Sequence, residues 1–133
     1  MTELYLADTG ALVRFYRGQA SPSWSSVVNA GLVGLCEPVR QEILRAAGGK
    51  RVFYEMDGLL RETFPYYSMR ESAWADAAEL QHDLADRGWH QSASPVDLLV
   101  AVAARHHKLT VLHQDGDFDT IARITGQPVR RID

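Results

Sequence analysis

The sequence predicts an α/β protein built on a mainly parallel sheet. Short apolar runs that suit buried strands, such as 3–7, 32–36 and 109–113, are separated by longer stretches in which apolar residues recur every three or four positions. Strands that alternate with helices form parallel sheets covered on both faces. We therefore expect a three-layer α/β/α architecture.

The first half of the chain is expected to form two strands and four helices. Serine-proline or proline opens two of the helices, because proline suits the first helical turn, and glycine follows the helices. Gly58 lies inside the predicted helix 50–63 and makes that helix a weaker prediction. The expected elements are strand 3–7, turn 8–10, helix 11–17, helix 22–30 with Ser21 as N-cap, strand 32–36, helix 38–47 and helix 50–63.

The second half contains the most apolar helix. It begins at Pro95, after the N-cap Ser94, and is apolar nearly all round, which predicts a central, buried position. The other expected elements of this half are a connection with a short strand at 64–69, an amphipathic helix at 70–87, a strand at 109–113, a helix from 118 that Gly126 ends and a strand at 128–132.

Length and composition suit one domain that spans residues 1–133. The chain is 46% hydrophobic, enough for a core, and no apolar run reaches the roughly 20 residues of a membrane helix. The N-terminus lacks the features of a signal peptide, so we expect a cytoplasmic protein. Cys36, the single cysteine, lies in an apolar run and is expected to be buried. The net charge of −3 does not exclude nucleic acid, because binding depends on local charge.

Four carboxylates stand where an apolar run meets a loop or a helix. Asp8 follows the first strand, Glu42 lies in the helix after the second, Asp97 is the third residue of the apolar helix, and Asp115 follows the strand 109–113. Acids beside buried segments are costly unless a cation compensates them. Because parallel sheets bind ligands beyond the carboxyl ends of their strands, one pocket could collect all four around a divalent metal.

Several alternatives remain or fail on sequence grounds. Taken alone, Asp8 also fits a turn or N-cap role, Glu42 is also an ordinary helical glutamate, and Asp97 also fits a favourable interaction with the helix dipole. A calcium loop that starts at Asp115 fails, because its sixth position is Thr120 and its twelfth is Gly126. No nucleophile elbow or phosphate-binding glycine loop occurs, and the histidines lack zinc spacing. Each of His106, His107 and His113 is therefore expected to be a surface or hydrogen-bonded side chain.

The acids lie in segments that together resemble the PIN-domain ribonucleases, and more closely the VapC-type toxins of bacterial toxin–antitoxin pairs. The specific segments are 94–103, Ser-Pro-Val-Asp-Leu-Leu-Val-Ala-Val-Ala, and 112–118, Leu-His-Gln-Asp-Gly-Asp-Phe. Leu6-Ala7-Asp8-Thr9 and Glu42-Ile43-Leu44 are more generic. Two positions depart from the family pattern, since Gly10 and His113 stand where a hydroxyl residue is frequent.

The resemblance implies a metal-dependent endoribonuclease with a PIN-like fold. It implies that Asp8, Glu42, Asp97 and Asp115 are the catalytic, metal-binding acids and that Asp117 is an accessory ligand. It also implies Mg²⁺ or Mn²⁺ as cofactor, RNA as substrate, a VapB-type antitoxin as partner and a homodimer. Transfer, ribosomal and messenger RNA all remain open as substrates.

Two other functions are kept as alternatives. One is a phosphatase of the haloacid dehalogenase type, which also has an aspartate after its first strand. That class needs a second aspartate two residues later, where this chain has Gly10. The other is a catalytically inactive module that binds RNA or protein. For the nuclease, water activated at the metal should attack and leave 5′-phosphate and 3′-hydroxyl ends.

Overall fold

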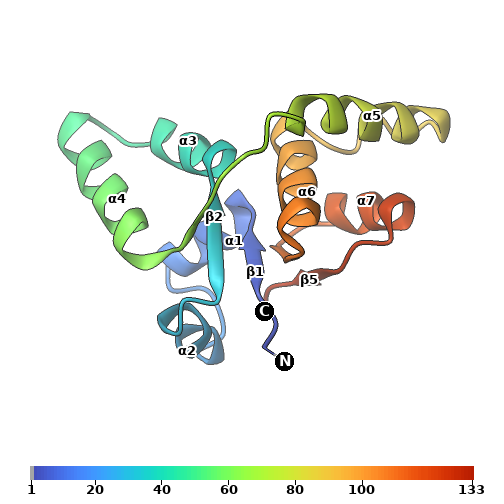
Figure 1. Cartoon of the computed structure of the whole chain (residues 1–133). Coiled ribbons are helices and arrows are strands. Elements are labelled where there is room, and N and C mark those ends of the chain that lie inside the picture. The colour runs from blue at the N-terminus through green and yellow to red at the C-terminus, as the bar shows by residue number, and fades with distance from the viewer. Residues whose placement is uncertain (1) are drawn as a thin grey trace.

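A computed structural model describes residues 2–133, which form a five-stranded sheet with helices on both faces (Figure 1). The strands lie in the order β3-β2-β1-β4-β5, and every neighbouring pair is parallel. This confirms the predicted α/β architecture. The elements are β1 (Tyr5–Ala7), α1 (Thr9–Tyr16), α2 (Ser23–Asn29), β2 (Val33–Cys36), α3 (Glu37–Arg45), α4 (Lys50–Thr63), β3 (Tyr66–Tyr67), α5 (Ala73–Asp86), α6 (Pro95–His107), β4 (Thr110–His113), α7 (Asp117–Thr125) and β5 (Val129–Arg131).

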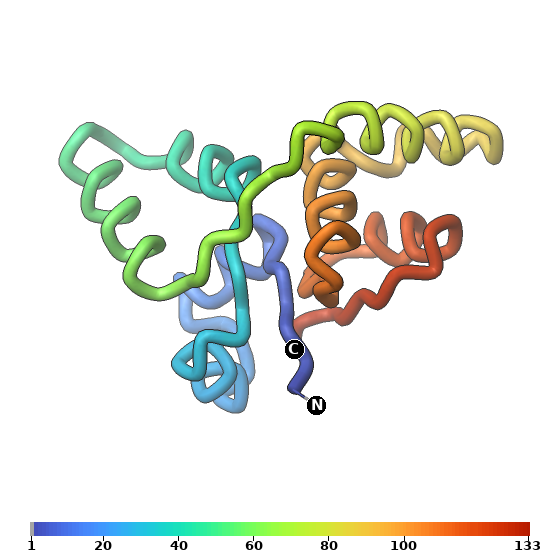
Figure 2. The backbone as a smooth tube through the Cα atoms, in the orientation of Figure 1, coloured from blue at the N-terminus to red at the C-terminus, as the bar shows by residue number. Residues whose placement is uncertain are grey.

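The strand order reverses direction next to β1. The chain first runs outward from β1 through β2 to β3, then crosses back to β4 and β5. Right-handed crossovers place α1 to α4 on one face and α5 to α7 on the other. The course of the chain agrees, because α3 and α4 lie on one side of β2 whereas α5, α6 and α7 lie beyond β1 (Figure 2). Such a reversal opens a crevice at the carboxyl ends of the strands.

The helix α6 forms the centre of the core. Every residue from Leu98 to Ala104 is buried, and the helix packs against both β1 and β4. This confirms the prediction of a central apolar helix. Cys36 at the end of β2 is fully buried, and burial raises the pKa of its thiol to about 11. Its role is therefore packing, as expected.

Five helices begin at residues other than those predicted, and for α3 and α7 the difference is a single residue. The predicted turn 8–10 is wrong, because α1 already begins at Thr9, with Asp8 as its N-cap. The prediction that Ser21 caps α2 is also wrong: Pro22 is the N-cap, and the Ser21 hydroxyl lies 3.2 Å from that of Ser23. Local hydrogen bonds of serine thus compete with the capping geometry.

The helix α5 begins three residues later than predicted, at Ala73. Its buried side is nevertheless the predicted apolar stripe, made of Ala73, Ala77, Leu80 and Leu84. Arg70 lies outside the helix, and its guanidinium donates to the carbonyl of His106 in α6 at 3.0 Å. This tertiary contact holds the segment before the helix.

Two glycines in regular elements should respond oppositely to alanine. A Cβ on Gly34 in β2 would lie 2.2 Å from the ring of Tyr67, whose far side faces the ring of His107 at 5.1 Å. Gly34→Ala should therefore lower the free energy of unfolding by roughly 1–3 kcal/mol. Gly58→Ala in α4 should raise it by up to about 1 kcal/mol, because a Cβ there meets no atom within 4 Å. Urea unfolding measures both, and equal stability of Gly34→Ala and the parent would show that the Tyr67 ring yields freely.

Across residues 2–133, no helix combines the length and the apolar composition that membrane crossing needs.

Candidate active site

Asp8 directly follows β1, the strand beside which the strand order reverses. Its carboxylate accepts a hydrogen bond from the backbone of Ala11 at 2.8 Å, and the residue is only 4% exposed. Burial is the main cause that raises the pKa of Asp8 to about 7, and that hydrogen bond opposes the rise. The negative charges of Asp115, Asp97 and Glu42 contribute smaller parts of the same rise. The charges of all three other site acids thus act on the carboxylate of Asp8.

Asp97 is fixed at the start of α6 by a capping box. Its Oδ2 accepts from the backbone N–H of Ser94 at 3.0 Å, while the Ser94 hydroxyl accepts from the Asp97 backbone N–H at 3.1 Å. Burial raises the pKa of Asp97, and the charges of Asp115 and Asp117 add to the rise. The third position of the helix, predicted from the sequence, is confirmed.

Asp115 follows β4 on the exposed side of the crevice. Its Oδ1 accepts from the backbone N–H of Asp117 at 2.9 Å, which orders the turn into α7. Burial, followed by the charge of Asp115, raises the pKa of Asp117. Asp119 instead contacts Arg131 at 3.4 Å and lies 3.6 Å from the ring of His113. Asp119 therefore interacts with Arg131 and His113 and not with the four predicted site acids.

Glu42 reaches the site from α3, the helix that follows β2. The hydroxyl of Thr9, the residue after Asp8, donates a hydrogen bond to its carboxylate. This bond joins the start of α1 to α3 and aims Glu42 at the same edge of the sheet. Sequence reasoning noted Thr9 as a neighbour of Asp8 but missed this partner, because 33 positions separate the two residues.

The acids share an edge and interact electrostatically, but they do not form a ready coordination shell. Within residues 2–133, no three His, Cys, Asp or Glu side chains are arranged to hold a metal ion. Mutual repulsion explains the spread, since carboxylates without a cation must separate or take up protons. The donor set nevertheless fits Mg²⁺ or Mn²⁺, which prefer carboxylate oxygen to nitrogen or sulfur.

Gly10 and Gln114 pack together between Asp8 and Asp115. A Cβ on Gly10 would lie 3.3 Å from that of Gln114 and 3.7 Å from Oδ1 of Asp8. A second aspartate at position 10, as a phosphatase of the haloacid dehalogenase type requires, would need Gln114 to move. The geometry therefore does not favour that alternative.

His113 differs from the expectation of a surface or hydrogen-bonded histidine. It is fully buried, and neither ring nitrogen has a hydrogen-bond partner among the described residues. Its ring packs against that of Phe118, with centroids 5.6 Å apart. Packing under α7 outweighs hydrogen bonding here. His106 and His107 behave as expected: one pairs with Asp76 at 2.7 Å and the other bonds to the carbonyl of Ser68.

The fold is that of a parallel α/β protein, and sequence comparison identifies the family. Residues 5–124 match the PIN domain, and the chain belongs to this family. It is 32% identical to Ribonuclease VapC21 of Mycobacterium tuberculosis over 97% of this chain and 94% of that protein. It is 36% identical to Ribonuclease VapC2 of the same species, over 96% and 92% of the two chains.

Solved structures show the same fold. The crystal structure of VapBC2 from Rickettsia felis, bound to a DNA fragment from their promoter, contains a chain that aligns with a TM-score of 0.79 at 14% identity. The alignment covers 98% of this protein and 99% of that chain. VapBC-5 from Mycobacterium tuberculosis aligns with a TM-score of 0.64 at 20% identity, over 98% of both chains. At these identities the likeness concerns the fold.

Proposed function

We propose that this protein is an Mg²⁺- or Mn²⁺-dependent endoribonuclease and the toxin of a type II toxin–antitoxin pair. The observation that carries the proposal is the placement of Asp8 and Asp115 just after the paired strands β1 and β4, with Glu42 bonded to the neighbouring Thr9, in a chain of the PIN family whose relatives are named ribonucleases. Asp8, Glu42, Asp97 and Asp115 would hold the metal, with Asp117 as an accessory ligand.

The acids of the site would act together by holding a metal ion. A bound ion would lower the pKa of a water molecule and offset the charge of the phosphodiester. Asp8, Asp97 and Asp115 are held by backbone N–H groups, so they present their oxygens without a large loss of entropy on binding. Thr9 orients Glu42 through its hydroxyl.

The chemistry predicts the ends of the RNA products. Attack by the 2′-hydroxyl would need an accessible acid–base pair, usually histidines. His113 is fully buried, whereas His106 and His107 are bonded to Asp76 and Ser68. The exposed His82 and His90 lie in α5 and in the loop that follows it, segments that carry none of the four acids. Water should therefore attack and leave 5′-phosphate and 3′-hydroxyl ends. Digestion of total RNA with and without Mg²⁺, followed by end-specific ligation, tests this. Ends that carry 2′,3′-cyclic phosphate would refute the mechanism, and absence of any cleavage would favour an inactive binding module.

The hydrogen bond from Thr9 to Glu42 gives a second test. Thr9→Val removes the hydroxyl at nearly constant volume and should weaken the apparent affinity for Mg²⁺ by about 10-fold, because partners of metal-binding side chains contribute on this scale. Thr9→Ser keeps the hydroxyl and should behave like the parent. Activity titrated with Mg²⁺ measures both. Equal titration curves for Thr9→Val and the parent would mean that the bond does not position Glu42.

The proposed partner is a VapB-type antitoxin, and the proposed assembly of the toxin is a homodimer. The support is the fold shared with chains of VapBC complexes. A short gene upstream should encode the antitoxin. Its product should copurify with this protein in a fixed ratio and inhibit RNA cleavage, and a gene product that does neither would count against the pairing.

A further inference from the structure

A cavity of about 690 Å³ lies beside the acids, between α3 and the beginnings of α5 and α6. Its lining includes four charged residues, Glu37, Glu42, Arg45 and Arg70, of which Glu37 is already paired with Arg40, and the apolar Trp74, Val96 and Leu99. Glu42 belongs to the proposed metal site, and Val96 directly precedes Asp97. The volume lies within the roughly 300–1,000 Å³ of small-molecule sites. An occupant of this cavity would therefore lie next to the position of bond cleavage.

Trp74 supplies a large exposed ring in this cavity. Its side chain is 72% exposed, whereas the residues that α5 buries, such as Ala77 and Leu80, lie on the other side of the helix. The indole thus contributes little to the packing of the helix. An exposed aromatic ring is a sequence-tolerant platform on which a nucleobase can stack.

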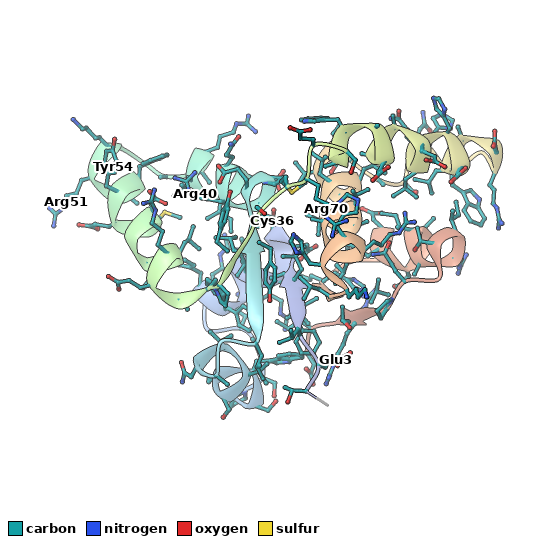
Figure 3. The ribbon with its side chains drawn as sticks, in the orientation of Figure 1. Glu3, Cys36, Arg40, Arg51, Tyr54 and Arg70 are labelled. Atoms are coloured by element: carbon teal, nitrogen blue, oxygen red, sulfur yellow. The ribbon has the colours of Figure 1, made fainter. Side chains whose placement is uncertain are left out.

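Arg45 and Arg70 supply positive charge without carboxylate partners among residues 2–133. Arg40, in contrast, pairs with both Glu37 and Asp57. The single hydrogen bond of Arg70 to the carbonyl of His106 leaves other N–H groups of its guanidinium for a ligand. Arg70 lies over α6, whereas Arg40 lies between α3 and α4 (Figure 3). An occupant should therefore be planar and apolar in part, and anionic in part.

A nucleotide of an unpaired RNA strand has both properties. Resting on the proposed ribonuclease function, we propose that the cavity holds a nucleobase adjacent to the cleaved phosphodiester, stacked on Trp74, with Arg45 and Arg70 contacting the flanking phosphates. An apolar helix of a protein partner would leave these two charges unpaired on burial, which is costly. The bases of a duplex are inaccessible to a stacking ring, so the substrate is a single-stranded or looped RNA.

Binding can be measured without cleavage in the background of Asp97→Asn, with Mg²⁺ present. A fluorescently labelled single-stranded oligoribonucleotide is titrated with the full-length protein. Trp74→Ala should weaken binding by about 10-fold, because stacking on one base contributes about 1–3 kcal/mol. Trp74→Phe should retain most of the affinity. Tyr54→Ala is the matched control, since Tyr54 is 63% exposed at the outer end of α4 (Figure 3) and should leave the affinity unchanged.

Two further readouts separate stacking from a structural role. RNA should quench the tryptophan emission of the parent, and Trp74→Phe should lose this quenching although Trp24 and Trp89 remain. Arg45→Gln should weaken binding and lower the salt dependence by about one released counterion. Thermal melting before each titration verifies that the variants are folded.

The outcomes distinguish this inference from the proposed function. If the parent cleaves RNA and folded Trp74→Ala binds RNA as tightly as the Asp97→Asn background, the base site is wrong and the nuclease assignment stands. If Trp74→Ala weakens only the antitoxin complex or the dimer, the cavity is a protein-docking surface and the inference is overturned. If the parent neither binds nor cleaves RNA with Mg²⁺ or Mn²⁺, the proposed function itself fails.

Discussion

Asp97→Asn is expected to reduce RNA cleavage by at least about 100-fold while the protein stays folded. Asp97 is held at the start of α6 by Ser94, and its carboxylate is within the electrostatic reach of Asp115 and Asp117. A metal site supplies several kcal/mol of transition-state stabilisation, and the loss of about 3 kcal/mol corresponds to a factor of about 100. The measurement is the initial rate of cleavage of an RNA in Mg²⁺.

The substitution is chosen because it changes charge and little else. Asparagine retains an oxygen that can accept the hydrogen bond from the backbone of Ser94, so the helix start should persist. Asp86→Asn, at the exposed end of α5, is the matched control and should cleave at the parental rate. Undiminished cleavage by Asp97→Asn would remove Asp97 from the proposed catalytic set.

Mg²⁺ or Mn²⁺ at saturating concentration is expected to raise the melting temperature by roughly 10 °C at pH 8. Two like charges about 5 Å apart repel by about 3 kcal/mol at an effective dielectric constant of about 20, and a shared cation relieves such repulsion. A ligand at 100 times its Kd stabilises the folded state by about 2.7 kcal/mol, which for a chain of this size corresponds to roughly 10 °C. Thermal scans with metal, and again after chelation, make the comparison.

The metal-free protein should become less stable through Asp8 as the pH rises. Burial raises the pKa of Asp8 from 3.8 to about 7, so the folded state holds a proton that the unfolded state has already released. The contribution of Asp8 to stability is therefore complete below pH 4 and is lost as the pH rises toward and through about 7. Metal must displace this proton, so its stabilising effect should be smaller at pH 5.5 than at pH 8.

Asp8→Asn tests both parts of that prediction. Asparagine caps a helix about as well as aspartate, so α1 should remain. The variant should lose most of the metal-induced rise in melting temperature, and its stability without metal should depend less on pH between 4 and 7. Identical melting curves of the parent with metal and with chelator would count heavily against the proposed site.

Elements with a strong local signal were predicted correctly. The start of α6 at Pro95 follows from Ser94 and the apolar run, because both the cap and the helix period are encoded within a few residues. The helix α4 forms over the predicted residues despite Gly58. Propensity is a weak preference, and packing against α3 overrides the cost of one glycine.

Elements that depend on distant contacts were placed less accurately. The residues 70–72 were predicted to be helical, but Arg70 instead bonds to the carbonyl of His106, 36 positions away. His113 has no sequence signal for complete burial without a hydrogen bond, because that state depends on the position of Phe118 and α7. Local sequence patterns reflect residues that are close in the sequence, and they do not reveal contacts between residues that are far apart in it.

The sequence by itself determined which residues carry charge at the ends of buried segments, and therefore which acids were candidates for the site. It could do so because apolar periodicity and capping are local. Only the tertiary structure decided that Thr9 bonds to Glu42, that the charges of three acids act on Asp8, and that Trp74 and Arg70 border a cavity beside them. These relations arise from the order of the parallel strands, which brings together segments far apart in the chain.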